Sequence, residues 1–87
     1  MTTVIKMDER VVNIISALEE LQVDTTIPRN VKTKIEIIVK ALKNEEEEFI
    51  IRKDKALNEL DEISEDTNIQ SYTRTQVWNI VSALEMI

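Results

Sequence analysis

The sequence predicts an all-α fold, an up-and-down bundle of four helices, and three observations lead to this prediction. The 87 residues include no glycine and one proline, which disfavours tight hairpin turns between strands. Apolar residues recur at the spacing of a helix, and no segment alternates like a strand. A repeat with a period of 42 residues indicates two copies of one helix–turn–helix unit.

The repeat aligns Leu18–Leu42 with Leu60–Leu84 without gaps, and ten of these 25 positions are identical. We therefore expect a single domain over residues 1–87, with one unit at about residues 4–43 and the other at about 44–87. Short connections make consecutive helices antiparallel neighbours, so each unit should form a hairpin of two helices.

Four apolar stripes at helical spacing are predicted to face the core. The first helix, over about residues 4–21, contributes Val4, Met7, Val11, Ile14, Ile15, Leu18 and Leu21. The second, over about residues 29–43, contributes Val31, Ile35, Ile38, Val39 and Leu42. The third, over about residues 45–63, contributes Phe49, Ala56, Leu57, Leu60 and Ile63. The fourth contributes Val77, Ile80, Val81, Leu84 and Ile87.

The breaks within the two hairpins contain residues that suit helix ends without glycine. Asp24-Thr25-Thr26 offers side-chain oxygens for capping, and Pro28 fits the first helical turn. Asp66-Thr67-Asn68 is the equivalent segment before the fourth helix. Ile27 and Ile69 follow these segments, and we expect them to be buried as apolar plugs.

Between the second and third helices only Asn44 indicates a break, because asparagine tolerates the left-handed conformation and caps helices well. We expect Glu45–Glu48 to form the first turn of the third helix, where the helix dipole favours acidic residues. Glu47 would then occupy the capping-box position. One continuous helix across residue 44 is the alternative.

Composition excludes several classes of function. Without cysteine or histidine there is no disulfide, zinc finger, thiol nucleophile or imidazole base. Paired-carboxylate chemistry stays open because acidic residues are abundant, but nothing singles out a pair, so we predict no catalytic, metal-binding or cofactor-binding residue. The four glutamates Glu45–Glu48 fan around a helix and cannot converge on one ion. No apolar stretch approaches the length of a membrane span, and the start lacks the apolar run of a signal peptide, so we expect a cytoplasmic protein.

Charge is distributed unevenly along this acidic chain. The net charge of −6 argues against a dedicated nucleic-acid binder. Residues 1–43 carry a net +1 and residues 44–87 a net −7. The second helix has a basic outer face, for which we expect the acidic surface of the third helix as partner: Arg29, Lys32, Lys40 and Lys43. A nucleic-acid accessory protein that uses this face is the alternative function.

Trp78 is the most informative residue for function. It replaces Glu36 of the first unit, about 120° around the helix from the centre of the core stripe. Arg74 lies one turn earlier and could stack on the indole, while Ser82 extends the same strip and Tyr72 lies nearby. The ring either covers a connection at the end of the bundle or belongs to a contact surface, where tryptophan, tyrosine and arginine are enriched.

Lys53 is the second unusual position, because it replaces Val11 inside an apolar stripe. Its ammonium group either reaches the edge of the bundle or pairs with the carboxylate of a partner. A domain of this size buries only about 60% of the surface of its unfolded chain, so dimerisation is an expected source of stability. The sequence assigns no biochemical activity, and our expectation is a non-enzymatic protein-interaction module, a homodimer or adaptor, that uses Arg74, Trp78 and Ser82.

The chain resembles, almost end to end, a family of small uncharacterised archaeal proteins. The resemblance is carried by Ile27-Pro28-Arg29-Asn30, a prolyl turn, and by Arg74-Thr75-Gln76-Val77-Trp78-Asn79-Ile80. It implies a four-helix bundle and an archaeal source, and no activity. Thr67 and Gln70 stand where relatives place prolines, which leaves the stiffness of that turn open.

The repeat is also similar to the helical hairpins of HEAT proteins. The similarity rests on Leu18, Leu21, Asp24, Val31-Lys32 and Ala41-Leu42. Two units are too few for a solenoid, so this analogy only favours protein binding.

Overall fold

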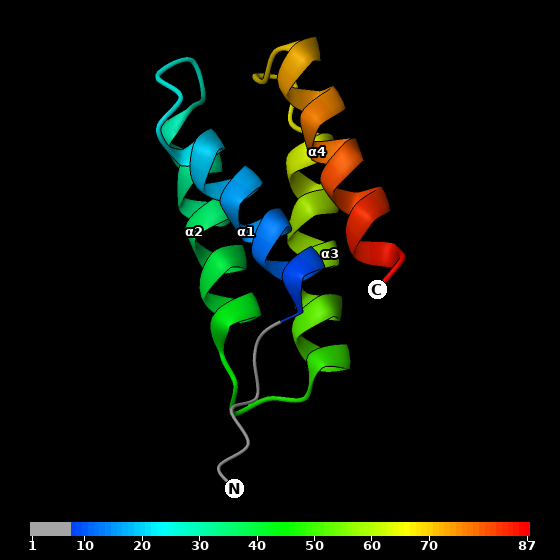
Figure 1. The fold of residues 1–87 in the computed structure, drawn as a ribbon. Helices are drawn as coiled ribbons and strands as arrows, with labels where there is room; N and C mark the ends of the chain where they lie inside the picture. The colour runs from blue at the N-terminus through cyan, green and yellow to red at the C-terminus, as the bar shows by residue number, and fades with distance from the viewer. Residues whose placement is uncertain (1–7) are drawn as a thin grey trace, which may run out of the picture.

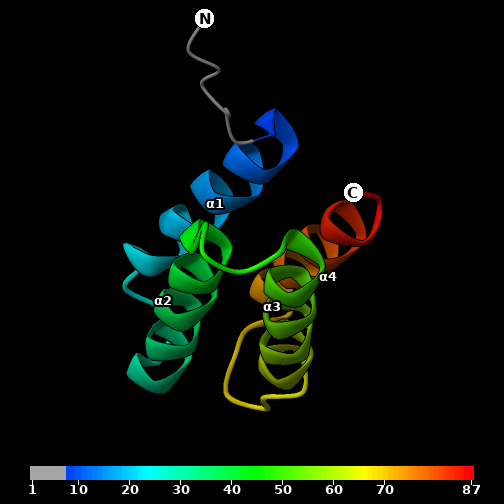
Figure 2. The same ribbon diagram turned by 90° about the horizontal axis from the view of Figure 1, so that it is seen from below.

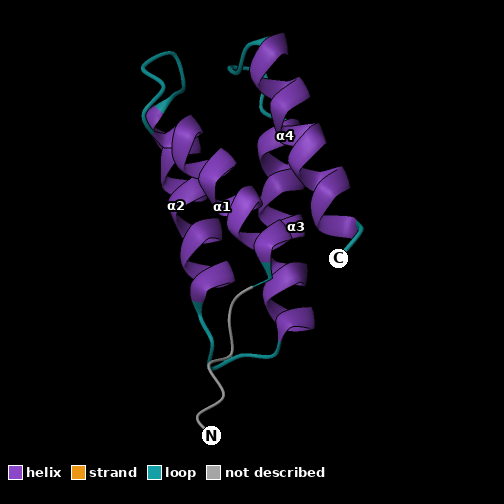
Figure 3. Ribbon diagram, viewed as in Figure 1, coloured by secondary structure: helices purple, strands orange, loops and turns teal. Residues whose placement is uncertain are grey.

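The computed structural model describes residues 8–87, which form four helices and contain no strand (Figure 3). Helix α1 spans Glu9–Gln22, α2 spans Arg29–Lys43, α3 spans Phe49–Ser64 and α4 spans Ser71–Glu85. Successive helices run antiparallel, and the connections after α1 and α3 lie at the same end (Figure 1). The predicted all-α, up-and-down arrangement is confirmed.

The four helices contact one another in a ring: α1 with α2, α2 with α3, α3 with α4, and α4 with α1. The contact between α2 and α3 is the most extensive, and that between α1 and α4 is the least. Seen along the helices, the α1–α2 and α3–α4 hairpins lie side by side (Figure 2). The internal duplication itself stays a prediction.

Most predicted inward residues are buried in one apolar core. All five stripe residues of α2 are buried, as are Val11, Ile14, Ile15, Leu18 and Leu21 of α1. In the other hairpin Ala56, Leu60, Ile63, Val77, Ile80 and Leu84 are buried. Partly buried residues pack against this core, namely Phe49, Leu57, Val81 and Ile87. Val4 and Met7 lie outside the described residues.

The plugs Ile27 and Ile69 are confirmed, with 5% and 6% of their surfaces exposed. Both belong to the apolar core. Thr73, which follows Ile69 by one turn, is a buried polar residue that the apolar pattern did not identify. Helical spacing therefore predicted where the core lies, but it passed over a polar side chain at an inward position.

The three connections share one local structure. In each, a side-chain oxygen accepts a hydrogen bond from the main-chain N–H two residues later: Thr26 to Asp24 at 2.9 Å, Glu46 to Asn44 at 3.1 Å and Asn68 to Asp66 at 2.8 Å. The next helix begins five residues after the accepting residue in all three cases. Such turns need no left-handed residue, and no described residue has a positive φ.

This arrangement corrects the predicted start of the third helix. Glu45–Glu48 lie in the connection, α3 begins at Phe49, and α2 and α3 are separate helices. Asn44 has φ −77° and ψ 94°, so it is extended rather than left-handed. The Asn44 side chain accepts a hydrogen bond from the Glu46 N–H, and because of this turn α3 begins only at Phe49. Glu47 takes the position of the plugs Ile27 and Ile69 and binds Lys55 at 2.8 Å instead.

The predicted capping by Asp24 and Asp66 is also wrong. The helices that follow have Pro28 and Gln70 as N-caps, and neither makes a side-chain capping bond. The carboxylates of Asp24 and Asp66 instead accept hydrogen bonds inside the turns. A capping aspartate does occur at the first helix, where Asp8 accepts from the Arg10 N–H at 2.8 Å. The hydrogen bond from the Arg10 side chain lowers the pKa of Asp8 to about 2.

The turn at Asp24 predicts a loss of stability in acid. The hydrogen bond from the Thr26 hydroxyl, followed by that from the Thr26 N–H, lowers the pKa of Asp24 in the folded protein. Because the folded pKa is below the unfolded one, this contribution is present above the unfolded pKa and is lost as pH falls through the folded pKa. Asp24→Asn keeps the acceptor oxygen, as Asn44 shows, and removes the titration.

We expect the wild type to be more stable than Asp24→Asn at pH 7. The difference should disappear as the pH falls below the usual range of an aspartate, near 4. Urea unfolding of both proteins between pH 7 and pH 2 measures it. An advantage that persists undiminished to the lowest pH would contradict this account of the turn.

Candidate interaction surface

The outer face of α4 is built by helix geometry from residues that the core leaves outside. At about 100° per residue, Ser71, Thr75, Trp78, Ser82 and Glu85 follow one line along α4, opposite the buried Val77, Ile80 and Leu84. We call these five residues the α4 strip. All five are exposed, and 55% of the surface of Trp78 is accessible. The indole is therefore not sealed under a connection of the described residues.

Arg74 lies at the edge of the α4 strip, and its guanidinium group turns back to the preceding connection. Nε donates to the Ser64 carbonyl oxygen at 2.9 Å, and Nη2 donates to that of Asp66 at 2.7 Å. A helix leaves its last carbonyl groups without partners, and a basic side chain can satisfy them. The predicted stacking of Arg74 on Trp78 is therefore replaced by a bond to the end of α3. The cation–π pair of the described chain is Arg52 over Phe49, 5.4 Å apart.

Arg52 repeats this arrangement one connection earlier. Its Nη1 donates to the Leu42 carbonyl oxygen at 3.0 Å, near the end of α2. Both arginines lie eight residues after the residue that starts the turn, Asn44 or Asp66. At the first connection the direction is reversed, because Gln22 donates to the carbonyl oxygen of Lys32 at 3.4 Å. These bonds fix the start of each helix to the end of the one before.

The two remaining candidates lie away from the α4 strip. Tyr72 is 69% exposed but is about 120° around the helix from Trp78, on the opposite side of the exposed face. Lys53 is half-buried on α3, and its Nζ lies 3.4 Å from the carbonyl oxygen of Ile87. The structure thus brings together Arg74, Trp78 and Ser82, and separates them from Tyr72 and Lys53.

The basic face of α2 pairs differently from the prediction. Lys40 binds Glu36 of the same helix at 3.1 Å, and Lys43 binds Glu19 of α1 at 3.5 Å. The ion pair between α2 and α3 is made by Lys34, which the prediction did not name, with Glu62 at 3.6 Å. The expected pairing of this face with α3 is therefore wrong for Lys40 and Lys43. The Lys43 side chain reaches α1, whereas that of Lys40 pairs within α2.

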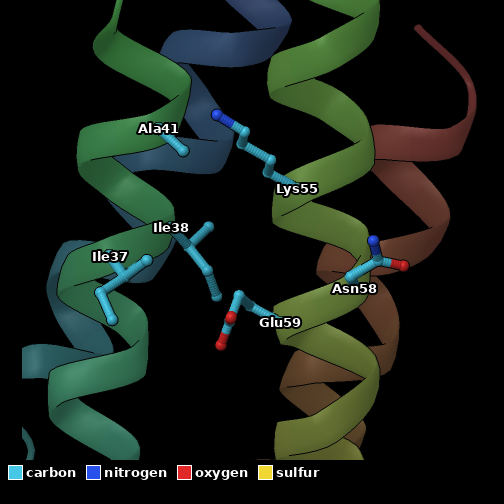
Figure 4. A pocket seen from close by; sticks show the side chains of 6 residues that line it. All are labelled: Ile37, Ile38, Ala41, Lys55, Asn58 and Glu59. Carbon is cyan, nitrogen blue, oxygen red and sulfur yellow. The ribbon is translucent and has the colours of Figure 1, made fainter.

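The structure also shows a shallow groove that the sequence did not reveal. It lies between α2 and α3 and has a volume of about 210 Å³ (Figure 4). Ile37, Ile38 and Ala41 line it from α2, while Lys55, Asn58 and Glu59 line it from α3. Ile37 is 49% exposed. An isoleucine outside the apolar stripe of α2 was the signal for this groove.

Over residues 8–87 no group of three or more acidic side chains converges where it could hold a metal ion. None of the helices in this part of the chain is long and apolar enough to cross a bilayer. The distinctive surface is the tryptophan of α4 rather than a cavity.

Fold and surface together define a small protein of four antiparallel helices with one tryptophan on its outer face. The chain belongs to the uncharacterised protein family UPF0147, whose family model matches residues 1–87. This confirms the resemblance to a family of small archaeal proteins.

Similar proteins come from several archaea. The UPF0147 protein of Methanocaldococcus jannaschii is 47% identical over 70 residues, which cover 80% of this chain and 75% of the relative. The UPF0147 protein of Pyrococcus furiosus is 43% identical over 82 residues, which cover 93% of this chain and 88% of the relative.

Two crystal structures share the fold. One is a protein of unknown function, MMP1188, with a TM-score of 0.88 and 45% identity over 99% of this chain and 98% of that one. The other is a UPF0147 protein from Thermoplasma acidophilum, with a TM-score of 0.85 and 32% identity. This match covers 91% of the present chain and 94% of the other. Both support the all-α fold.

The bonds of Arg74 predict a structural role that substitution can test. Arg74→Met keeps the length and apolar stem of the side chain but leaves the Ser64 and Asp66 carbonyl groups without this donor. We expect the free energy of unfolding to fall by about 1–3 kcal/mol. Arg29→Met, at an exposed position in the first turn of α2, should change it by less than about 0.5 kcal/mol. Equal effects in urea unfolding would show that the guanidinium bonds contribute nothing specific.

Proposed function

We propose that the protein is a non-enzymatic interaction module of the cytoplasm, which acts as a homodimer or adaptor and binds its partner through the α4 strip. The single observation that supports the proposal is an exposed Trp78 on a helix anchored at its start by Arg74. Tryptophan is strongly enriched among the residues that dominate binding energy. A chain without cysteine or histidine also lacks the side chains most used as nucleophile and general base.

The surroundings of Trp78 suit such a contact. Ser82 and Thr75 lie one turn away on the same line, and both are small, so a partner can approach the ring closely. Anchoring matters because a preordered helix loses less conformational entropy when it binds than a mobile segment would. The α4 strip therefore combines a large apolar ring, small neighbours and a rigid support.

A photoreactive amino acid placed at position 78 tests this use of the surface. We expect it to cross-link a protein when the purified variant is irradiated in native extract. The same group at position 36, the equivalent exposed position on α2, should give no comparable adduct. The photoreactive amino acid at position 72 tests whether the partner binds the Tyr72 side of α4 rather than the Trp78 side. Adducts from positions 36 or 72 in the absence of one from position 78 would overturn the proposal.

The second candidate function is binding of nucleic acid through the basic face of α2. The observation that favours it is the composition of α2, five basic residues and one acidic residue. Against it, Lys34, Lys40 and Lys43 already pair with carboxylates of the chain. A phosphate would have to replace these partners against a net charge of −6.

We expect the purified protein to show no salt-sensitive binding to short labelled RNA or DNA at low ionic strength, measured by fluorescence anisotropy. Phosphate contacts give affinities that fall steeply with salt concentration, so such binding is easily recognised. Binding that disappears in a Lys40→Glu variant would instead establish the second candidate.

A further inference from the structure

We propose that the partner of the α4 strip is a second copy of this chain, with the two α4 helices antiparallel across a twofold axis at Trp78. This inference rests on the proposed function and names its partner. It follows from the charges of the four helices, from the spacing of residues along α4, and from the place of the Arg74 guanidinium group.

The charge of α4 permits contact with itself. Helix α2 has five basic residues and one acidic residue, and α1 has three acidic residues and one basic residue. Twofold pairing of either helix would bring like charges together, which costs free energy. Helix α4 has one residue of each sign, Arg74 and Glu85, and is neutral in total. Helix α3 has three basic and four acidic residues. With two charges of opposite sign, α4 therefore meets a second copy of itself with the least repulsion among the four helices.

The spacing along α4 places small residues on either side of the facing rings. Consider an antiparallel pair whose twofold axis passes at Trp78. A residue that lies a given number of positions before Trp78 in one copy then faces the residue that lies the same number of positions after Trp78 in the other copy. Ser82, four residues after Trp78, and Thr75, three residues before it, then flank the indole of the other copy. These short side chains leave room for each tryptophan to lie across the facing helix.

The same geometry pairs the two charges of α4. The guanidinium group of Arg74 bonds to Ser64 and Asp66, so it lies toward the start of α4, near the level of Ser71. Ser71 precedes Trp78 by seven residues, and Glu85 follows it by seven. Glu85 of one copy therefore faces the Arg74 guanidinium group of the other, and the twofold axis repeats this pair. Opposite charges at both ends set the antiparallel direction.

The first experiment is sedimentation equilibrium of the full chain over a range of concentrations. We expect a dimer with a dissociation constant on the order of 10–100 μM, since two helices form a small interface. Trp78→Glu should weaken it at least about 30-fold, the loss typical of a dominant interface residue. Tyr72→Glu, with the same change of charge on the other side of α4, is the matched control and should leave it intact. Circular dichroism confirms that each variant is folded.

The chain contains one tryptophan, so its fluorescence reports the environment of position 78 directly. We expect the emission of the wild type to shift to shorter wavelength as the dimer forms. A wild type that remains monomeric to millimolar concentration overturns the inference, as does a dimer that forms without this shift. The cross-linking experiment above judges the proposed function separately, because an adduct to a different protein differs in mass from an adduct of two copies.

The second experiment tests the direction of pairing. Glu85→Lys places a positive charge in the last turn of α4, which the helix dipole favours in the monomer, yet it should weaken the dimer about fivefold or more. Glu46→Lys is the control, because it changes the net charge equally at an exposed site in the α2–α3 connection. A parallel or unrelated interface would let both variants dimerise equally well, and this result would overturn the antiparallel arrangement.

Discussion

The hydrogen bonds that Asp24, Asn44 and Asp66 accept from the main chain are the interactions on which the other features of this fold depend. In each connection the next helix begins five residues after the residue that accepts this bond. Short connections keep consecutive helices adjacent and antiparallel, and this brings the four apolar stripes to a common core. In each connection one polar side chain thus stabilises the turn after a helix, a position where many proteins have a glycine.

The arginines complete these connections from the other side. Arg52 and Arg74 donate to carbonyl groups at the ends of the preceding helices, where backbone acceptors would otherwise lack partners. The guanidinium group of Arg74 belongs to α4, whereas its acceptors are the last residue of α3, Ser64, and Asp66 of the α3–α4 connection, so these bonds tie the start of α4 to the end of α3. The surface around Trp78 is therefore supported by the same interaction that ends α3. Structure and candidate binding surface depend on one side chain.

Charge separates the two outer helix faces that could serve as binding surfaces. On α2, three lysines are already engaged by glutamates of α1, α2 and α3, so much of its positive charge is neutralised within the chain. On α4 the two charged residues lie apart and the space between them is filled by Trp78 and small polar residues. An apolar ring between charges of opposite sign suits a protein surface better than a phosphate. This contrast is why we favour α4.

Patterns along the chain predicted the four helices, their inward residues and the plugs Ile27 and Ile69, because helical spacing and the burial of apolar side chains depend on neighbours in sequence. It also placed Trp78 outside the core, since a position about 120° from the stripe cannot reach it. The packed fold was needed to show that Asn44 forms a turn rather than starting a helix, and that Lys43 pairs with α1 rather than α3. These outcomes depend on which main-chain N–H a short side chain finds and on how each helix is rotated against its neighbours. Both are relations between segments, which a pattern along one segment does not contain.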